Sequence, residues 1–168
     1  MDIGVTLRAQ IVAGLIAGLI GAVTIEICLI GAQVVDGAPP ASIASSFAFI
    51  AVTLLGPGAY ANPAAVPIGA VMHLIVSIGW AFGYVYLVRT QPQLLIRPIL
   101  SGGVFGIVVW VCMQIVLITA GQYHRAANPR TLTVQLLAHI VFFGVPVALV
   151  VSSMLRHAAG PLRSERLR

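Results

Sequence analysis

Four strongly polar side chains lie inside otherwise apolar stretches of the chain, and they are the residues best suited to chemistry. They are Glu26, His73, Gln114 and His139. Two imidazoles, a carboxylate and an amide form a suitable ligand set for a divalent ion such as Zn²⁺ or Fe²⁺. Imidazole also titrates near neutral pH and burial tunes carboxylates, so the same set could relay protons or ions. We therefore expect these four residues to bind a metal ion or to relay protons.

Two further interpretations of these residues stay open. His73 and His139 could ligate haem b as a bis-histidine pair in a membrane redox subunit. The polar set could also serve only to fix the register of packed helices, as in a structural or assembly subunit of a membrane complex. Catalysis is the least supported role, because the sequence places no nucleophile within reach of a base. The residues thus favour a non-enzymatic protein whose cofactor would be a divalent metal ion or haem b.

Helical spacing places further polar side chains beside the two histidines. Residues three, four and seven apart share one face of an α-helix. Polar and amphipathic residues occur four, seven and eleven residues after His73 and four residues before His139, so we expect them to support the site from the same faces. The supporting polar residues are Ser77, Trp80, Tyr84 and Gln135.

The composition indicates which elements must position these residues. Of 168 residues, 60% are hydrophobic and only 8% are charged, and the mean hydropathy is +1.05. Soluble domains carry about 25% charged residues, so a soluble surface could not be covered here. Such hydrophobicity excludes disorder, and two cysteines, Cys28 and Cys112, are too few for a disulfide scaffold. The composition therefore predicts a polytopic membrane protein.

Apolar runs define the expected membrane spans. A helix needs about 20 residues to cross a hydrocarbon core of about 30 Å. A fifth run, 41–56, lies between Pro39-Pro40 and Gly56-Pro57-Gly58 and is too short to span, which favours a re-entrant or interfacial helix. We expect an all-α fold in one membrane domain, residues 1–168: a four-transmembrane-helix bundle with this short extra helix between the first two spans. The spans are expected at about 11–33, 65–88, 99–120 and 132–155.

The nine arginines divide unequally between the two sides of the predicted bundle. With four spans, seven lie on the side of the termini, and only Arg125 and Arg130 lie on the other; a fifth span at 41–56 would instead place six outside. Because cytoplasmic loops are enriched in basic residues, we expect four spans, both termini in the cytoplasm and the short helix on the outer face. The basic tail, 156–168, then meets lipid rather than nucleic acid. The arginines expected to set topology and contact lipid headgroups are Arg8, Arg89, Arg97, Arg156 and Arg163.

The predicted spans place the four polar residues at a similar depth. With a rise of 1.5 Å per residue, Glu26 and His139 lie about 10 Å below the outer surface, His73 about 12 Å and Gln114 about 9 Å. Each span contributes one of them. We therefore expect a polar layer across the bundle interior, in the outer half of the bilayer.

Small residues spaced by four occur in every predicted span and favour close helix packing in lipid. Pro146 lacks an N–H and should bend the last helix or free the carbonyl of Phe142. The connections between the last three spans are short, which predicts that those neighbours are antiparallel and adjacent. The small-residue pairs are Gly14 with Gly18, Gly79 with Gly83, Gly102 with Gly106, and Gly144 with Ala148.

Two segments of the chain resemble the YagU-like family of small bacterial inner-membrane proteins. Residues 73–84, HLIVSIGWAFGY, match a family pattern of a histidine followed by an apolar run that ends in Gly-Tyr, and residues 138–143, AHIVFF, match the start of its last helix. The late acid of a Gly-rich first helix, Glu26, also fits. In the third span the chain has Trp110 and Gln114 where the family has a histidine. The resemblance implies a location in the bacterial inner membrane, with the lipid bilayer as partner; it leaves open a homo-oligomer or a larger membrane complex.

Overall fold

The structure is a computed structural model that describes residues 5–39, 41–121 and 128–159. Within these ranges every regular element is a helix or helical turn. In chain order they are α1 (Leu7–Val35), α2 (Ala41–Leu55), η1 (Pro57–Ala61), α3 (Ala65–Thr90), η2 (Pro92–Leu95), α4 (Pro98–Thr119), α6 (Pro129–Leu137), the π-helical η3 (Ala138–Gly144) and α7 (Val145–Ala159).

Four of these helices are long and apolar enough to cross a membrane. They are α1, α3, α4 and a continuous helix over Pro129–Ala159 that joins α6, η3 and α7. The shorter apolar helix α2 follows α1, in the place where the sequence predicts a fifth, non-spanning segment. The predicted fold class, an all-α four-helix membrane bundle with a short extra helix, is confirmed.

Local signals set where the helices begin and end. The Thr6 side chain caps α1 by accepting a hydrogen bond from the Ala9 amide at 3.3 Å. The Asn128 side chain accepts the Arg130 amide at 2.9 Å at the start of α6, where Pro129 occupies the first turn. Beyond the end of α1, Gly37 adopts a φ of 73°, which reverses the chain and which residues with a Cβ rarely adopt.

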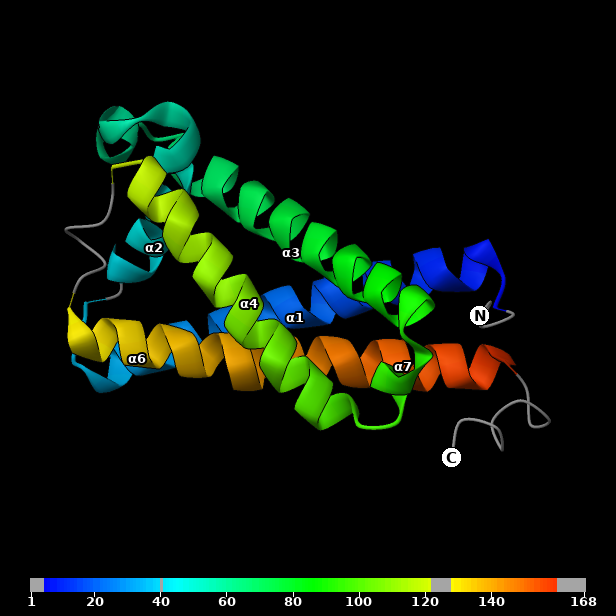
Figure 1. The fold of residues 1–168 in the computed structure, drawn as a ribbon. Helices are drawn as coiled ribbons and strands as arrows, with labels where there is room; N and C mark the ends of the chain where they lie inside the picture. The colour runs from blue at the N-terminus through cyan, green and yellow to red at the C-terminus, as the bar shows by residue number, and fades with distance from the viewer. Residues whose placement is uncertain (1–4, 40, 122–127, 160–168) are drawn as a thin grey trace.

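The helix α1 lies at the centre of the packing. It contacts α3, η3 and α7, while α4 crosses η3 and α7 obliquely (Figure 1). The start of α1, η2 and the end of α7 lie at one end of the bundle, which we call the η2 end (Figure 1). At the opposite end, the α2 end, α2 packs on α3. The short connection between α3 and α4 predicts that these two helices pack side by side, but α4 packs mainly on η3 and α7.

The apolar core has two parts. One consists mainly of residues from α1, α3, α4 and α7, and its large, fully buried members lie toward the η2 end. The other joins α2, η1 and the start of α3. Along α3, His73 and Ser77 lie between Ile68 of the second part and Trp80 of the first. The large, fully buried side chains of this first part are Tyr84, Val88, Leu95, Val147, Val151 and Leu155.

Glycines allow the backbones of α4, η3 and α7 to touch. A Cβ added to Gly144 would lie 2.1 Å from the carbonyl oxygen of Gly102, and one added to Gly106 would lie 2.3 Å from that of His139. No real Cβ tolerates such distances, so glycine is required for this crossing. The close approach that the small-residue pairs predict is therefore present between these helices.

Gly18 of α1 lies in a close helix contact, whereas Gly79 and Gly83 of α3 do not. A Cβ at Gly18 of α1 would lie 2.5 Å from the Cα of Ile78, so α1 approaches α3 closely there. Gly79 and Gly83 of α3 have no neighbour within 4 Å among the described residues. The small-residue pair of α3 thus mediates no helix contact, because the face of α3 that meets α1 carries Ile78 instead.

The last membrane helix changes its winding before Pro146. The π-helical η3 ends at Gly144, one residue before the start of α7. Pro146 has no amide hydrogen to donate to the carbonyl of Phe142, four residues earlier. The hydroxyl of Thr24 on α1 donates a hydrogen bond to this carbonyl. The carbonyl of Phe142, which Pro146 cannot bond, therefore accepts a hydrogen bond from a neighbouring helix.

Candidate polar site between the helices

The structure brings Glu26 and His73 together between α1 and α3. Glu26 Oε1 lies 3.5 Å from His73 Nε2, and the two side chains are only 13% and 19% exposed, respectively. The close packing of Gly18 against Ile78 holds these two helices near enough for the pair to meet. Two ionisable groups thus lie side by side in a largely buried position between α1 and α3.

His73 has further contacts that hold its ring in place. Its Nε2 atom lies 3.3 Å from the carbonyl oxygen of Ala22, one turn before Glu26 on α1. The ring of Phe47 from α2 packs against the imidazole with 6.5 Å between ring centroids and an interplanar angle of 68°. The histidine is thus held by three helices, and α2 covers it from the α2 end.

The second carboxylate oxygen of Glu26 is buried and has no hydrogen-bond partner among the described residues. The indole Nε1 of Trp110 on α4 is also buried without a hydrogen-bond partner among the described residues. Buried polar atoms are almost always paired with protein groups or with ordered water. Glu26 therefore has the capacity to accept one more hydrogen bond, or to hold a proton, at Oε2.

Gln114 and His139 form a separate polar group between α4 and the last membrane helix. Gln114 Nε2 donates to Gln135 Oε1 at 3.2 Å. His139 Nδ1 lies 2.7 Å from the carbonyl oxygen of Gln135 and donates to it, since a carbonyl can only accept. By their hydrogen bonds and ion pair, the residues of the predicted layer form two groups, Glu26 with His73 and Gln114 with Gln135 and His139.

The two groups do not combine into a metal site in this structure. No three His, Cys, Asp or Glu side chains among the described residues come close enough to hold one metal ion. The donor set does not fit bis-histidine haem either, because His73 directs its Nε2 toward Glu26 and the Ala22 carbonyl, while an axial ligand must direct a ring nitrogen to iron. The geometry offers a carboxylate–imidazole pair instead.

The supporting residues expected on α3 all face the protein. Ser77 and Tyr84 are buried, and Trp80 is half-buried against Phe105 of α4, with ring centroids 6.2 Å apart. The Tyr84 hydroxyl lies 2.7 Å from the hydroxyl of Ser101, and its ring packs edge-on against Phe105 at 5.0 Å. These contacts join α3 to α4, so this stripe connects helices rather than adding groups to the Glu26–His73 pair.

Sequence reasoning did not identify three residues that shape the site. Thr24 bonds the Phe142 carbonyl, Ser101 bonds Tyr84, and Phe47 packs on His73. Thr24 could have been found, because a carbonyl freed by Pro146 needs a donor from a neighbouring helix. Ser101 and Phe47 carry no such signal, since their roles depend on the orientation of α4 and α2.

The arginines expected near lipid headgroups lie at the η2 end. Arg8 is in the first turn of α1, Arg89 is in the last turn of α3, Arg97 precedes α4 and Arg156 is in the last turn of α7; all four are exposed. At the α2 end, Arg130 forms an ion pair with Asp36. Arg163, Arg125 and the tail beyond residue 159 lie outside the described residues.

Four apolar helices around an internal carboxylate–imidazole pair define a small polytopic helical membrane protein. The chain matches the Family of unknown function (DUF6789) over residues 8–160 and belongs to that family. No match was found among curated proteins or among solved structures. The family match does not test the resemblance to YagU-like proteins, which stays a prediction.

Proposed function

We propose that this membrane protein holds and transfers a proton at the Glu26–His73 pair. The observation that carries the proposal is the 3.5 Å approach of Glu26 Oε1 to His73 Nε2 in a largely buried position. An ionisable residue inside a membrane helix is costly, and such residues commonly form proton or ion pathways. Glu26 Oε2 supports this function, because it is a buried acceptor without a partner in the described part of the chain.

The proton would move between the His73 imidazole and the Glu26 carboxylate. Imidazole accepts or releases a proton near neutral pH. A carboxylate 3.5 Å away can receive this proton directly or after a small movement of either side chain. His139 forms its hydrogen bond with the Gln135 carbonyl rather than with this pair, so the proposed relay uses two residues rather than four. A divalent ion would need ligands beyond Glu26 and His73, and the described residues place no third His, Cys, Asp or Glu side chain there.

Proton flux through reconstituted vesicles tests the proposal. The full chain is reconstituted into liposomes that contain a pH-sensitive dye, and a potassium diffusion potential drives protons inward. We expect flux above that of protein-free liposomes for the wild type, and a fall to that background for Glu26→Gln and His73→Gln. Each substitution removes one proton-exchanging group while keeping a side chain of similar size.

Two matched variants control this experiment. Asp36→Asn removes the other carboxylate of the described chain, which is exposed and paired with Arg130, and His157→Gln removes an exposed histidine at the end of α7. Both should keep wild-type flux. A wild-type flux equal to that of empty liposomes, or equal losses in all four variants, would contradict the proposal.

Hydrogen bonding across helices supports a second candidate, a purely structural role. His73 with the Ala22 carbonyl, Gln114 with Gln135, and Tyr84 with Ser101 each join separate elements. If this role is the only one, Glu26→Gln and His73→Gln lower the free energy of unfolding while wild-type vesicles show no flux above background. Measuring both quantities on the same preparations separates the two candidates.

We further infer that the protein sits in the bacterial inner membrane with the η2 end in the cytoplasm. Arg8, Arg89, Arg97 and Arg156 are all exposed at that end, whereas Arg130 at the α2 end is paired with Asp36. Cytoplasmic segments near membrane helices are enriched in such residues. The resemblance to YagU-like proteins is consistent with this location, and a homo-oligomer or larger complex is compatible with it.

A further inference from the structure

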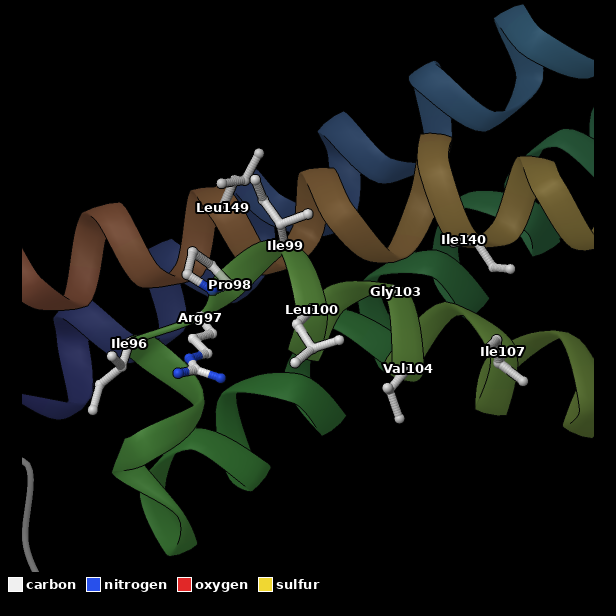
Figure 2. Close-up of a pocket in the computed structure, with 10 residues that line it drawn as sticks. All are labelled: Ile96, Arg97, Pro98, Ile99, Leu100, Gly103, Val104, Ile107, Ile140 and Leu149. Carbon is white, nitrogen blue, oxygen red and sulfur yellow. The ribbon is translucent and has the colours of Figure 1, made fainter.

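A groove runs along the outer surface of α4 on the side of the last membrane helix. It has a volume of about 650 Å³, and its lining is apolar except at one end (Figure 2). Ile96 and Arg97 lie at that end, and Ile107 and Ile140 lie at the other (Figure 2). The remaining lining residues are Pro98, Ile99, Leu100, Gly103, Val104 and Leu149.

Gly103 forms the hollow of this groove. Ile99, Gly103 and Ile107 are spaced by four residues, so they follow one row along α4. A Cβ at Gly103 would have only one neighbour within 4 Å, the Cγ2 atom of Ile140 at 3.8 Å. The row therefore lacks a side chain between two isoleucines, and this gap leaves room for a ligand against the helix.

Arg97 gives the groove a charged end. Its guanidinium is exposed, and the carboxylates among the described residues, Glu26 and Asp36, pair with His73 and Arg130 instead. Arg97 thus has no protein counter-ion in the described part of the chain. A negatively charged ligand group at this end would supply one.

The length of the groove matches one lipid leaflet. From Arg97 to Ile107 the helix rises about 15 Å, which is half of a hydrocarbon core about 30 Å thick. We propose that this groove is a binding site for one anionic phospholipid, with an acyl chain against Gly103 and the phosphate at Arg97. The inference is independent of the proton relay, since the groove contains neither Glu26 nor His73.

Native mass spectrometry of the full chain in mild detergent tests this site. Delipidated protein is titrated with phosphatidylglycerol and, separately, with phosphatidylcholine of the same acyl composition. For the wild type we expect one bound phosphatidylglycerol with about fivefold preference over phosphatidylcholine, the factor expected for one arginine near an anionic lipid. Arg97→Gln should abolish the preference while phosphatidylcholine binding stays unchanged.

Filling the hollow tests the acyl-chain part of the site. Gly103→Leu should weaken the binding of both lipids, because its side chain occupies the groove. Gly79→Leu is the matched control, since Gly79 faces open space on α3, and Arg89→Gln is the control for charge at the same end; both should bind as the wild type does. Equal affinity for the two lipids in the wild type, or wild-type binding by Gly103→Leu, would overturn the proposal.

Discussion

Glu26 is the carboxylate that the described chain carries inside a membrane-spanning helix, and the structure gives it a single ionisable partner. His73 meets it across the α1–α3 contact at 3.5 Å. The same histidine also contacts a backbone carbonyl of α1 and the ring of Phe47. The proton chemistry proposed above therefore depends on a few atoms that three helices hold, and the flux measurements on Glu26→Gln and His73→Gln apply at this scale.

A second residue-scale prediction concerns Thr24. Thr24→Val keeps the size of the side chain but removes the hydroxyl that donates to the Phe142 carbonyl. We expect the free energy of unfolding in detergent to fall by about 1 kcal/mol, within the range measured for hydrogen bonds between membrane helices. Thr24→Ser retains the donor and should lose less. Equal losses in the two variants would show that packing, rather than the hydrogen bond, stabilises this contact.

Between helices, backbone contact at glycines decides the orientation of α4. Gly102 lies against Gly144, and Gly106 lies against the carbonyl of His139. Apolar burial does not drive helices together in lipid, so such close contacts contribute much of the attraction. They also explain why Gln114 reaches Gln135 on the last membrane helix rather than the Glu26–His73 pair on α1 and α3.

Alanine substitutions at two glycines test this packing. Both Gly106→Ala and Gly79→Ala gain helix propensity of about 1 kcal/mol, so their difference isolates the effect of packing. We expect Gly106→Ala to be less stable than Gly79→Ala by about 1–3 kcal/mol, because its Cβ would lie 2.3 Å from a backbone oxygen. Unfolding of both variants in the same detergent measures this difference. Similar stabilities of the two variants would contradict the prediction, because they would mean that α4 and η3 can move apart at little cost in free energy.

For the whole molecule, the arrangement of charge predicts orientation in the membrane. Among the described residues, four exposed arginines lie at the η2 end, whereas Arg130 at the α2 end is paired with Asp36. Such an imbalance orients small membrane proteins with the basic end in the cytoplasm. The proposed phospholipid site has its charged end at the same η2 end, which would place the bound lipid in the cytoplasmic leaflet.

Cysteine labelling tests this orientation. In a chain with Cys28→Ser and Cys112→Ser, single cysteines are introduced as Tyr60→Cys in η1 and Ala158→Cys near the end of α7. A membrane-impermeant maleimide applied to intact bacterial spheroplasts should label the Tyr60→Cys variant alone. Lysis should then expose the Ala158→Cys variant to the same reagent. The reverse pattern would contradict the predicted orientation.

Much of the fold could be predicted from the sequence, but less of the site. The apolar lengths predicted four long helices and one short one, and the structure has them. Position along a helix also gives each polar residue an expected depth in the bilayer, which stays a prediction. Depth alone could not show which of these four polar residues meet: Glu26, His73, Gln114 and His139. Each helix can rotate about its own axis without changing the depth of its residues.

The sequence by itself thus determined the membrane class, the number of long helices and the short α2, because these depend on local apolar length and on Pro and Gly at the ends. Only the tertiary structure decided that Glu26 pairs with His73 while Gln114 turns to Gln135. It also decided that Gly102 and Gly106, rather than Gly79 and Gly83, make a close helix contact. The physical reason is that rotation and crossing of helices are set by how all their surfaces fit together, and no single helix carries that information.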